Sequence, residues 1–225
     1  MSRQFALLLG AALAWASAQP VIPYDSLMDT RVGIDGMIDN EDGREYPATY
    51  RDKASGLTVH WGFDDSLIYV GLETKGRGWL AIGFGSDKMN ESNMIVGYYT
   101  EDSTEVTNQI GANHTHARSP QSDSAIQEAE IDYDEETGVT TMEFTYPLRF
   151  PAGKGEALAI PGLEPGGTYD VILAQNTKSV SLNAKHTNLS ALKVKLADVT
   201  HSPKLETQPQ PQPQPKPQSQ PQPKK

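Results

Sequence analysis

Hydrophobic and polar residues alternate with a period of two in several segments of the chain, beginning with LTVHWGF at residues 57–63. In an extended chain this pattern places Leu57, Val59, Trp61 and Phe63 on one face. Alternating or continuous apolar runs predict seven further strands, at LIYVGLET (67–74), WLAIGFG (79–85), NMIVGYYT (93–100), AIQEAEIDYD (125–134), VTTMEFTYPL (139–148), TYDVILAQ (168–175) and LSALKVKLAD (189–198).

The strands follow one another at short spacing, and turn sequences such as EETG (135–138) and EPGG (164–167) separate some of them. No amphipathic pattern of three helical turns competes with them, and no internal repeat predicts a propeller or solenoid. We therefore predict an all-β domain, a two-sheet antiparallel immunoglobulin-like β-sandwich, with a closed barrel as the alternative.

The N-terminal segment 1–18 is typical of a secretory signal peptide. It has a positive charge at Arg3, an apolar run over residues 5–15, and the small residues Ala16 and Ala18 at an A-x-A spacing. The run is shorter than the roughly 20 apolar residues of a membrane span, which favours cleavage over the alternative of an uncleaved anchor. We expect an exported protein, periplasmic or extracellular, with no membrane span after cleavage.

The C-terminal segment 201–225 is rich in proline and glutamine and has almost no apolar residues. Such a composition buries too little apolar surface to offset the entropy of ordering, so we expect a disordered spacer. The β-sandwich domain is then predicted to span residues 19–200.

Composition narrows the classes of function. The formal net charge is −10, which disfavours nucleic acid as a partner because phosphate binding needs a basic face. The absence of cysteine excludes disulfides, thiolate metal sites, a nucleophilic thiol and covalent C-x-x-C-H haem attachment. No nucleophile elbow, phosphate-binding glycine loop or H-E-x-x-H motif is present, so we expect a binding or electron-transfer domain and not an enzyme.

Methionine and histidine are the remaining soft or nitrogen ligands. Met89 lies in a polar segment between two apolar runs, and His186 precedes the last alternating segment. His114 and His116 lie two residues apart and so project to one side of an extended chain. Thioether and imidazole suit copper, which leaves a copper site built from Met89, Met94, His114 and His116 as one interpretation.

The stretch GRGWLAIGFGSDKMNESNMIVGYY (76–99) resembles the DOMON superfamily, and within it the haem-binding branch similar to the cytochrome domain of cellobiose dehydrogenase and the small haem subunit of ethylbenzene dehydrogenase. The resembling elements are a G-W-x-A-I-G-F strand at 78–84, a loop with Met89, and an I-V-G-Y strand at 95–98. The resemblance continues on both sides of this stretch and covers roughly residues 33–198, which is the whole domain.

The resemblance implies a b-type haem held noncovalently, with Met89 and His186 as axial ligands and electron transfer to a redox partner, such as an oxidoreductase or a membrane electron carrier. Lys185 is an alternative second ligand, because some relatives use lysine. We expect haem contacts from Trp79, Phe84 and Met94, although ordinary core packing would also explain them. Other superfamily members bind sugars, so a carbohydrate-binding module stays an alternative to the haem and copper interpretations.

Overall fold

The structure is a computed structural model that describes residues 19–39, 45–112, 115–118, 125–149 and 162–199. Its helix α1 (Met28–Arg31) is a single turn, and the other elements are strands. The predicted signal peptide (1–18) and tail (201–225) lie outside the described residues, so both stay predictions. The strands are β1 (Val21–Ile22), β2 (Ala48–Arg51), β3 (Thr58–Phe63), β4 (Leu67–Lys75), β5 (Trp79–Phe84), β6 (Asn93–Tyr99), β7 (Thr104–Ala112), β8 (Thr115–Arg118), β9 (Glu128–Asp134), β10 (Val139–Pro147), β11 (Thr168–Asn176) and β12 (Asn188–Leu196).

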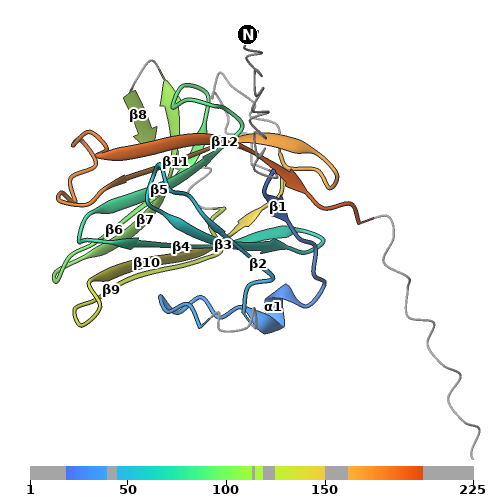
Figure 1. Ribbon diagram of the computed structural model, residues 1–225, viewed down its shortest axis with the longest axis horizontal. Coiled ribbons are helices and arrows are strands. Elements are labelled where there is room, and N and C mark those ends of the chain that lie inside the picture. Colours follow the sequence, from blue (N-terminus) through green and yellow to red (C-terminus); the bar gives the residue numbers. More distant parts are fainter. Residues whose placement is uncertain (1–18, 40–44, 113–114, 119–124, 150–161, 200–225) are drawn as a thin grey trace, which may run out of the picture.

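The strands form two separate sheets, which lie one above the other in Figure 1. The seven-stranded sheet has the order β1-β12-β11-β5-β6-β7-β8, and the five-stranded sheet has the order β2-β3-β4-β10-β9. Neighbouring strands are antiparallel, except for the short parallel pair of β1 with β12. The predicted all-β two-sheet sandwich is confirmed, and the closed barrel is not what the chain forms.

The core lies between the sheets and contains the residues that alternation predicts. On β3 and its approach, Leu57, Val59, Trp61 and Phe63 are all buried in this core. Strand β10 adds Met142, Phe144 and Tyr146 in the same way. Period-two alternation thus identifies the inner face of these strands correctly.

Strand β7 was not predicted by alternation, because its polar residues are buried. Asn108 is fully buried and donates its side-chain N–H to the Asn93 Oδ1 at 2.9 Å. Gln109 is 5% exposed and donates to the Thr107 hydroxyl at 2.9 Å. Buried polar side chains are tolerated when they are hydrogen-bonded, so a polar strand can occupy the interior of a sheet.

Candidate functional site

The outer face of the seven-stranded sheet carries an apolar cluster of its own, separate from the core. Successive residues of β5 point to opposite faces, so Leu80 and Ile82 enter the core while Trp79 and Ala81 face outward. We call the outward group the outer-face cluster. Its buried members are Trp79, Ala81, Met94 and Val96, and Met89, Tyr98, Ile172, Ala174 and Leu182 pack against them.

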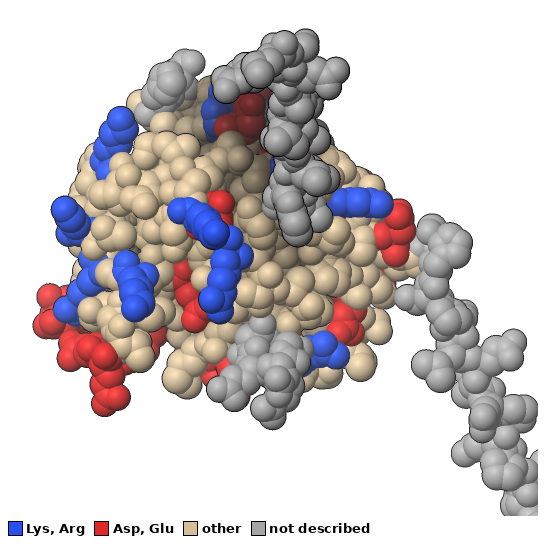
Figure 2. Space-filling view, in the orientation of Figure 1, with Lys and Arg blue, Asp and Glu red and all other residues tan. Residues whose placement is uncertain are grey.

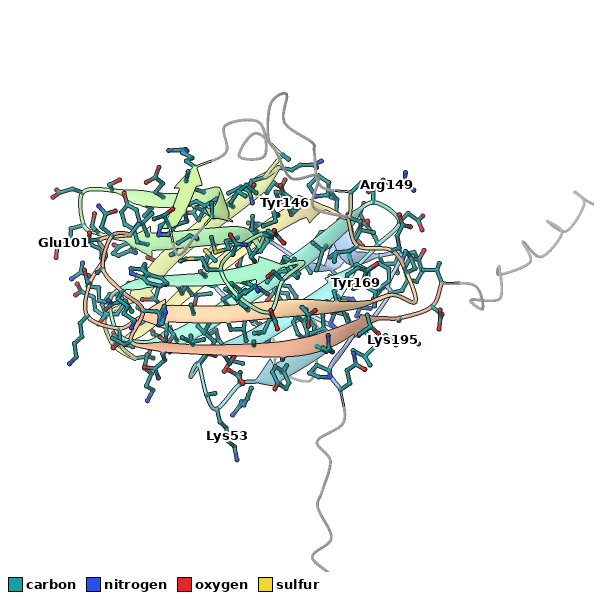
Figure 3. The ribbon with its side chains drawn as sticks, turned by 90° about the horizontal axis from the view of Figure 1, so that it is seen from above. Lys53, Glu101, Tyr146, Arg149, Tyr169 and Lys195 are labelled. Carbon is teal, nitrogen blue, oxygen red and sulfur yellow. The ribbon has the colours of Figure 1, made fainter. Side chains whose placement is uncertain are left out.

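This cluster is unusual for an antiparallel sheet, whose outer face is commonly solvated. Its buried members are all less than 9% exposed. Cross-strand pairing of Trp79 with Tyr98 and of Ala81 with Val96 gathers them on two central strands, β5 and β6. Figure 3 views the molecule from above, with β11 and β12 running across it. The outer face therefore carries buried apolar side chains in addition to those of the core between the sheets.

Met89 reaches this face from the loop between β5 and β6. Glu91 N–H donates to the Gly111 carbonyl at 2.9 Å, and Gly111 N–H donates to the Ser92 carbonyl at 3.2 Å, so the loop is tied to β7. A Cβ on Gly111 would lie only 1.7 Å from the Met89 carbonyl oxygen, so this close approach requires glycine. The half-buried Met89 side chain is thereby held against the outer-face cluster.

His186 lies in the loop between β11 and β12, and Asn176 organises that loop. The Asn176 Oδ1 accepts hydrogen bonds from the N–H groups of Lys178 and Ser179, both at 2.9 Å, and its Nδ2 donates to the Lys185 carbonyl at 2.8 Å. One side chain therefore fastens the loop at both of its ends. Asn176 is itself buried, so water competes little for these bonds.

The same loop is attached to the outer-face cluster through Trp79. Its indole Nε1 donates to the Ala184 carbonyl at 3.2 Å, and Leu182 from the loop packs on the cluster. His186 is half-buried next to these contacts, and burial lowers the pKa of its imidazole, with a further lowering by the charge of Lys185. The imidazole is therefore kept neutral near pH 7, the form that binds a metal.

The structure thus brings Trp79, Met94 and Met89 to one face and attaches the loop of His186 to the same cluster. Phe84 is different: it is buried in the core between the sheets. Phe84 lies five positions after Trp79 on one strand, so the two side chains point to opposite faces. Ordinary core packing, the alternative interpretation of Phe84, describes its position, and the expected haem contact stays an untested prediction.

The residues of the copper interpretation lie partly together. His116 pairs across the sheet with Gly111, on which Met89 rests, and its Nδ1 is hydrogen-bonded to the Gln109 Oε1. Met94 pairs with the same Gln109. His114 lies outside the described residues. Within the described ranges, no three His, Asp or Glu side chains are placed to hold a metal ion.

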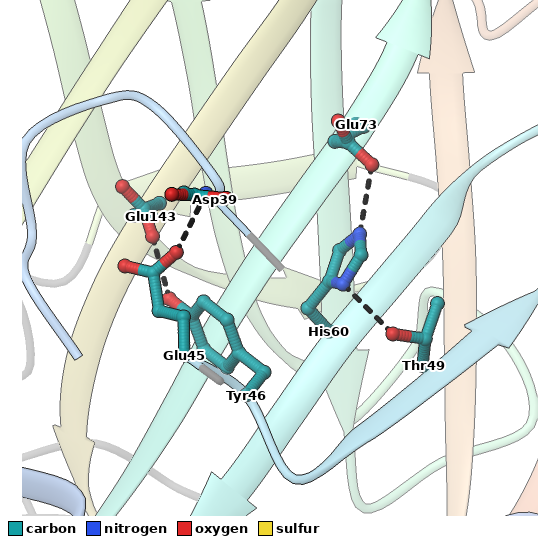
Figure 4. Close-up of polar contacts among 7 residues, drawn as sticks. All are labelled: Asp39, Glu45, Tyr46, Thr49, His60, Glu73 and Glu143. Carbon is teal, nitrogen blue, oxygen red and sulfur yellow. Dashed lines mark hydrogen bonds and ion pairs between the residues drawn. The ribbon is translucent and has the colours of Figure 1, made fainter. Parts of the chain in front are cut away.

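A second polar site, which the sequence reasoning missed, lies on the outer face of the five-stranded sheet. Glu143 of β10 is fully buried and accepts a hydrogen bond from the Tyr46 hydroxyl at 2.7 Å and from the Gly36 N–H at 3.0 Å. Burial raises the pKa of this carboxyl to about 7. The signal in the sequence is a glutamate at an outward position between apolar residues of a long strand. Figure 4 shows this contact beside a second one, in which His60 lies between Thr49 and Glu73.

Comparison with known proteins identifies the family. The model of the DOMON domain matches residues 53–176, which contain β3 to β11 and the Met89 loop. The chain belongs to the DOMON family. This confirms the resemblance to the DOMON superfamily that the β5–β6 segment predicts. No curated protein matches the chain.

Among solved structures, this DOMON domain is similar to the cytochrome b domain of pyranose dehydrogenase from Coprinopsis cinerea, with a TM-score of 0.51 and 8% identity over 64% of this chain and 79% of that chain. It also matches the cytochrome domain of Myriococcum thermophilum cellobiose dehydrogenase (TM-score 0.42, 17% identity, 66% of this chain and 88% of that one). A family 9 carbohydrate-binding module from Caldicellulosiruptor kristjanssonii in complex with cellotriose matches with a TM-score of 0.42 and 10% identity, over 80% of this chain and 94% of that one. At these identities the first similarity supports the fold alone, and the other two add no argument.

The described residues contain no helix that is long and apolar enough to cross a membrane.

Proposed function

We propose that this DOMON domain is an exported b-type cytochrome that binds haem noncovalently on the outer face of its seven-stranded sheet, with Met89 and His186 as axial ligands, and passes electrons to a redox partner protein. The observation that carries the proposal is that two loops, which lie at opposite ends of β5, both contact one apolar cluster. One loop presses Met89 on the outer-face cluster, and the other, which bears His186, is hydrogen-bonded to Trp79 of that cluster.

The residues present fit a haem group by their chemistry. A porphyrin needs an apolar wall, which the cluster residues supply, and two axial donors, for which a thioether and a neutral imidazole are suited. The chain has no cysteine, so any haem would be held by these two bonds and by apolar contact. Met94, the second methionine of the cluster, would lie against the ring as a polarisable contact.

The chain's own residues would set how the group behaves. When bound, haem supplies a one-electron ferric–ferrous couple. As a ligand, the Met89 thioether would favour the ferrous state and so raise the reduction potential relative to two nitrogen ligands. Asn176 and Trp79 would keep His186 in position through their hydrogen bonds to its loop. With two protein ligands, no coordination position would be left for a substrate, which suits an electron carrier.

The proposal is tested by adding haem to the purified domain, comprising residues 19–200, and recording oxidised and reduced spectra. We expect stoichiometric uptake and a six-coordinate, low-spin cytochrome b spectrum. Met89→Leu and His186→Gln should each abolish the low-spin bands. Met37→Leu, which changes a 65% exposed methionine, and His116→Gln are matched controls that should keep them.

Several results would contradict this proposal. A colourless protein that takes up no haem would refute it, and copper or sugar binding by such a protein would favour the corresponding alternative. Loss of the low-spin bands in Lys185→Ala but not in His186→Gln would assign the second ligand to Lys185 instead.

A further inference from the structure

We propose that an exposed basic patch beside the His186 loop is the docking surface for an acidic surface on the redox partner protein. This inference rests on the proposed function, because it places the partner next to the loop of an axial ligand. The patch comprises Lys53, Lys75, Arg77, Lys178 and Lys185, which come from the β2–β3 turn, the last residue of β4 with the connection that follows it, and the β11–β12 loop.

Two contacts place the segments that carry the patch at the same end of the sandwich. In the β2–β3 turn, the Asp52 carboxylate accepts a hydrogen bond from the Ser190 hydroxyl of β12 at 2.6 Å. In the β4–β5 connection, a Cβ on Gly76 would lie 2.9 Å from the Thr177 carbonyl oxygen, which belongs to the β11–β12 loop. The five basic residues therefore lie at one end of the sandwich and not at scattered positions.

Most of the positive charge of the patch is unpaired. The four lysines are exposed, and within the described residues none of them forms a salt bridge. Arg77 is half-buried: it forms an ion pair with Glu101 at 3.2 Å and lies over the rings of Tyr99 and Tyr133. Asp52 is the acidic group within the patch, and its hydrogen bonds to Ser190 and Ser55 hold its pKa low against the effect of burial. The patch therefore creates a local positive electrostatic potential on a chain whose net charge is −10.

The neighbouring charges favour a protein over an anionic membrane. The β6–β7 turn carries Glu101 and Asp102, and the β9–β10 turn is hydrogen-bonded to the patch through Gly76 N–H and the Gly138 carbonyl at 2.9 Å. That turn bears two further glutamates, Glu135 and Glu136. Figure 2 shows Lys and Arg side chains gathered toward the left of the molecule, with Asp and Glu below them at the same end. An anionic membrane surface would extend over these turns as well as the patch and would be repelled by them, whereas an acidic surface on a protein can be limited to the area of the patch.

The first test needs no haem. A fluorescein-labelled decaglutamate peptide is titrated into the haem-free protein at low and high salt, in parallel with phosphatidylserine vesicles. The patch variant K53E/K75E/K178E is compared with the control variant R149E/K193E/K195E, which has the same change in net charge. Figure 3 places Arg149 and Lys195 at the opposite end from Glu101.

We expect the peptide to bind at low salt and to be released by salt, and the patch variant to bind it about tenfold more weakly than the control variant. Failure of the peptide to bind, or equal binding by the two variants, would overturn the proposal. Tighter binding of the vesicles than of the peptide would assign the patch to a membrane and would overturn it as well.

The second test uses the haem-loaded protein. Ferrous haem gives one electron to hexacyanoferrate(III), which becomes hexacyanoferrate(II). A protein with a net charge of −10 should repel this anion, so that added salt speeds the reaction, but a basic patch beside the haem predicts that salt slows it. The patch variant should reverse the salt dependence, and acceleration by salt in the unmodified protein would refute the inference. Absence of haem uptake would contradict the proposed function and leave the peptide test to decide on the patch.

Discussion

Glu143→Gln should remove a large pH dependence from the stability of this domain. The carboxylate is fully buried and accepts hydrogen bonds from the N–H groups of Asp35 and Gly36 and from the Tyr46 hydroxyl. Burial raises its pKa from 4.5 to about 7, so the folded chain binds the proton more tightly than the unfolded chain. The contribution of Glu143 to the free energy of unfolding is therefore fully present below pH 4.5 and is lost as the pH rises through 7. The difference corresponds to roughly 3 kcal/mol at pH 8.

Glutamine keeps the shape and the hydrogen bonds without the charge. Its amide oxygen can accept from the two backbone N–H groups, and its amide N–H can donate to the Tyr46 hydroxyl oxygen. Urea unfolding between pH 5 and pH 8 should therefore show a decline of roughly 2.5 kcal/mol in the unmodified protein relative to Glu143→Gln. The lowered pKa of His186 is common to both proteins, so its contribution cancels in the difference. Glu136→Gln, at an exposed position, is the control. A stability difference between protein and variant that stays constant from pH 5 to pH 8 would refute the reasoning.

Three further substitutions test the two loops of the candidate site. Asn176→Ala removes the hydrogen-bond partner of two loop N–H groups and one carbonyl. We expect hydrogen exchange to show a loop that is about 2–3 kcal/mol less stable against local opening. We also expect NMR titration to show a pKa of His186 closer to its ordinary value. Unchanged exchange would contradict this. Gly111→Ala places a methyl group 1.7 Å from the Met89 carbonyl oxygen, so the loop must move. We expect the free energy of unfolding in urea to fall by about 1–3 kcal/mol and the low-spin haem spectrum to be lost. A variant with native stability would show that the contact is not tight. Trp79→Phe removes the indole donor, and we expect hydrogen exchange to show a free energy of opening of the β11–β12 loop that is about 1 kcal/mol lower. An unchanged free energy of opening would show that this bond is unimportant.

Alternation of apolar and polar residues predicted which side chains enter the core on strands whose other face is polar. On β10, Met142, Phe144 and Tyr146 alternate with threonine and glutamate, and the structure buries the apolar set in the core. Strand β5 gives no such information, because all six of its residues are buried. Its apolar residues belong to two different faces, and only their odd or even position distinguishes them. Residue type alone does not show on which face Phe84 lies, whereas its even position on β5, shared with Leu80 and Ile82, places it in the core.

The polar residues of the interior could not be predicted from composition. β7 is buried through side-chain hydrogen bonds such as that of Asn108, and a sequence does not state which partner a polar side chain will find. The same holds for Asn176, whose role depends on three backbone groups that the β11–β12 loop brings to it. The family pattern located Met89 because that loop has a recognisable sequence between two strands, and Asn176 has no comparable sequence context.

The two parts of the candidate site come from different kinds of structure, and this has a physical consequence. The outer-face cluster belongs mainly to β5 and β6, which are central strands paired on both sides, and it depends on residues that also hold the sheet together. Met89 and His186 belong to loops that rest on this cluster through a few specific contacts, at Gly111 and at Trp79. Because loop contacts are individually small and strand burial is large, a loop can change its ligand without loss of the fold, whereas a change in the cluster affects both. Within one fold, the strands would then set how strongly an apolar group is retained, and the two loops would set its ligands and hence its reduction potential.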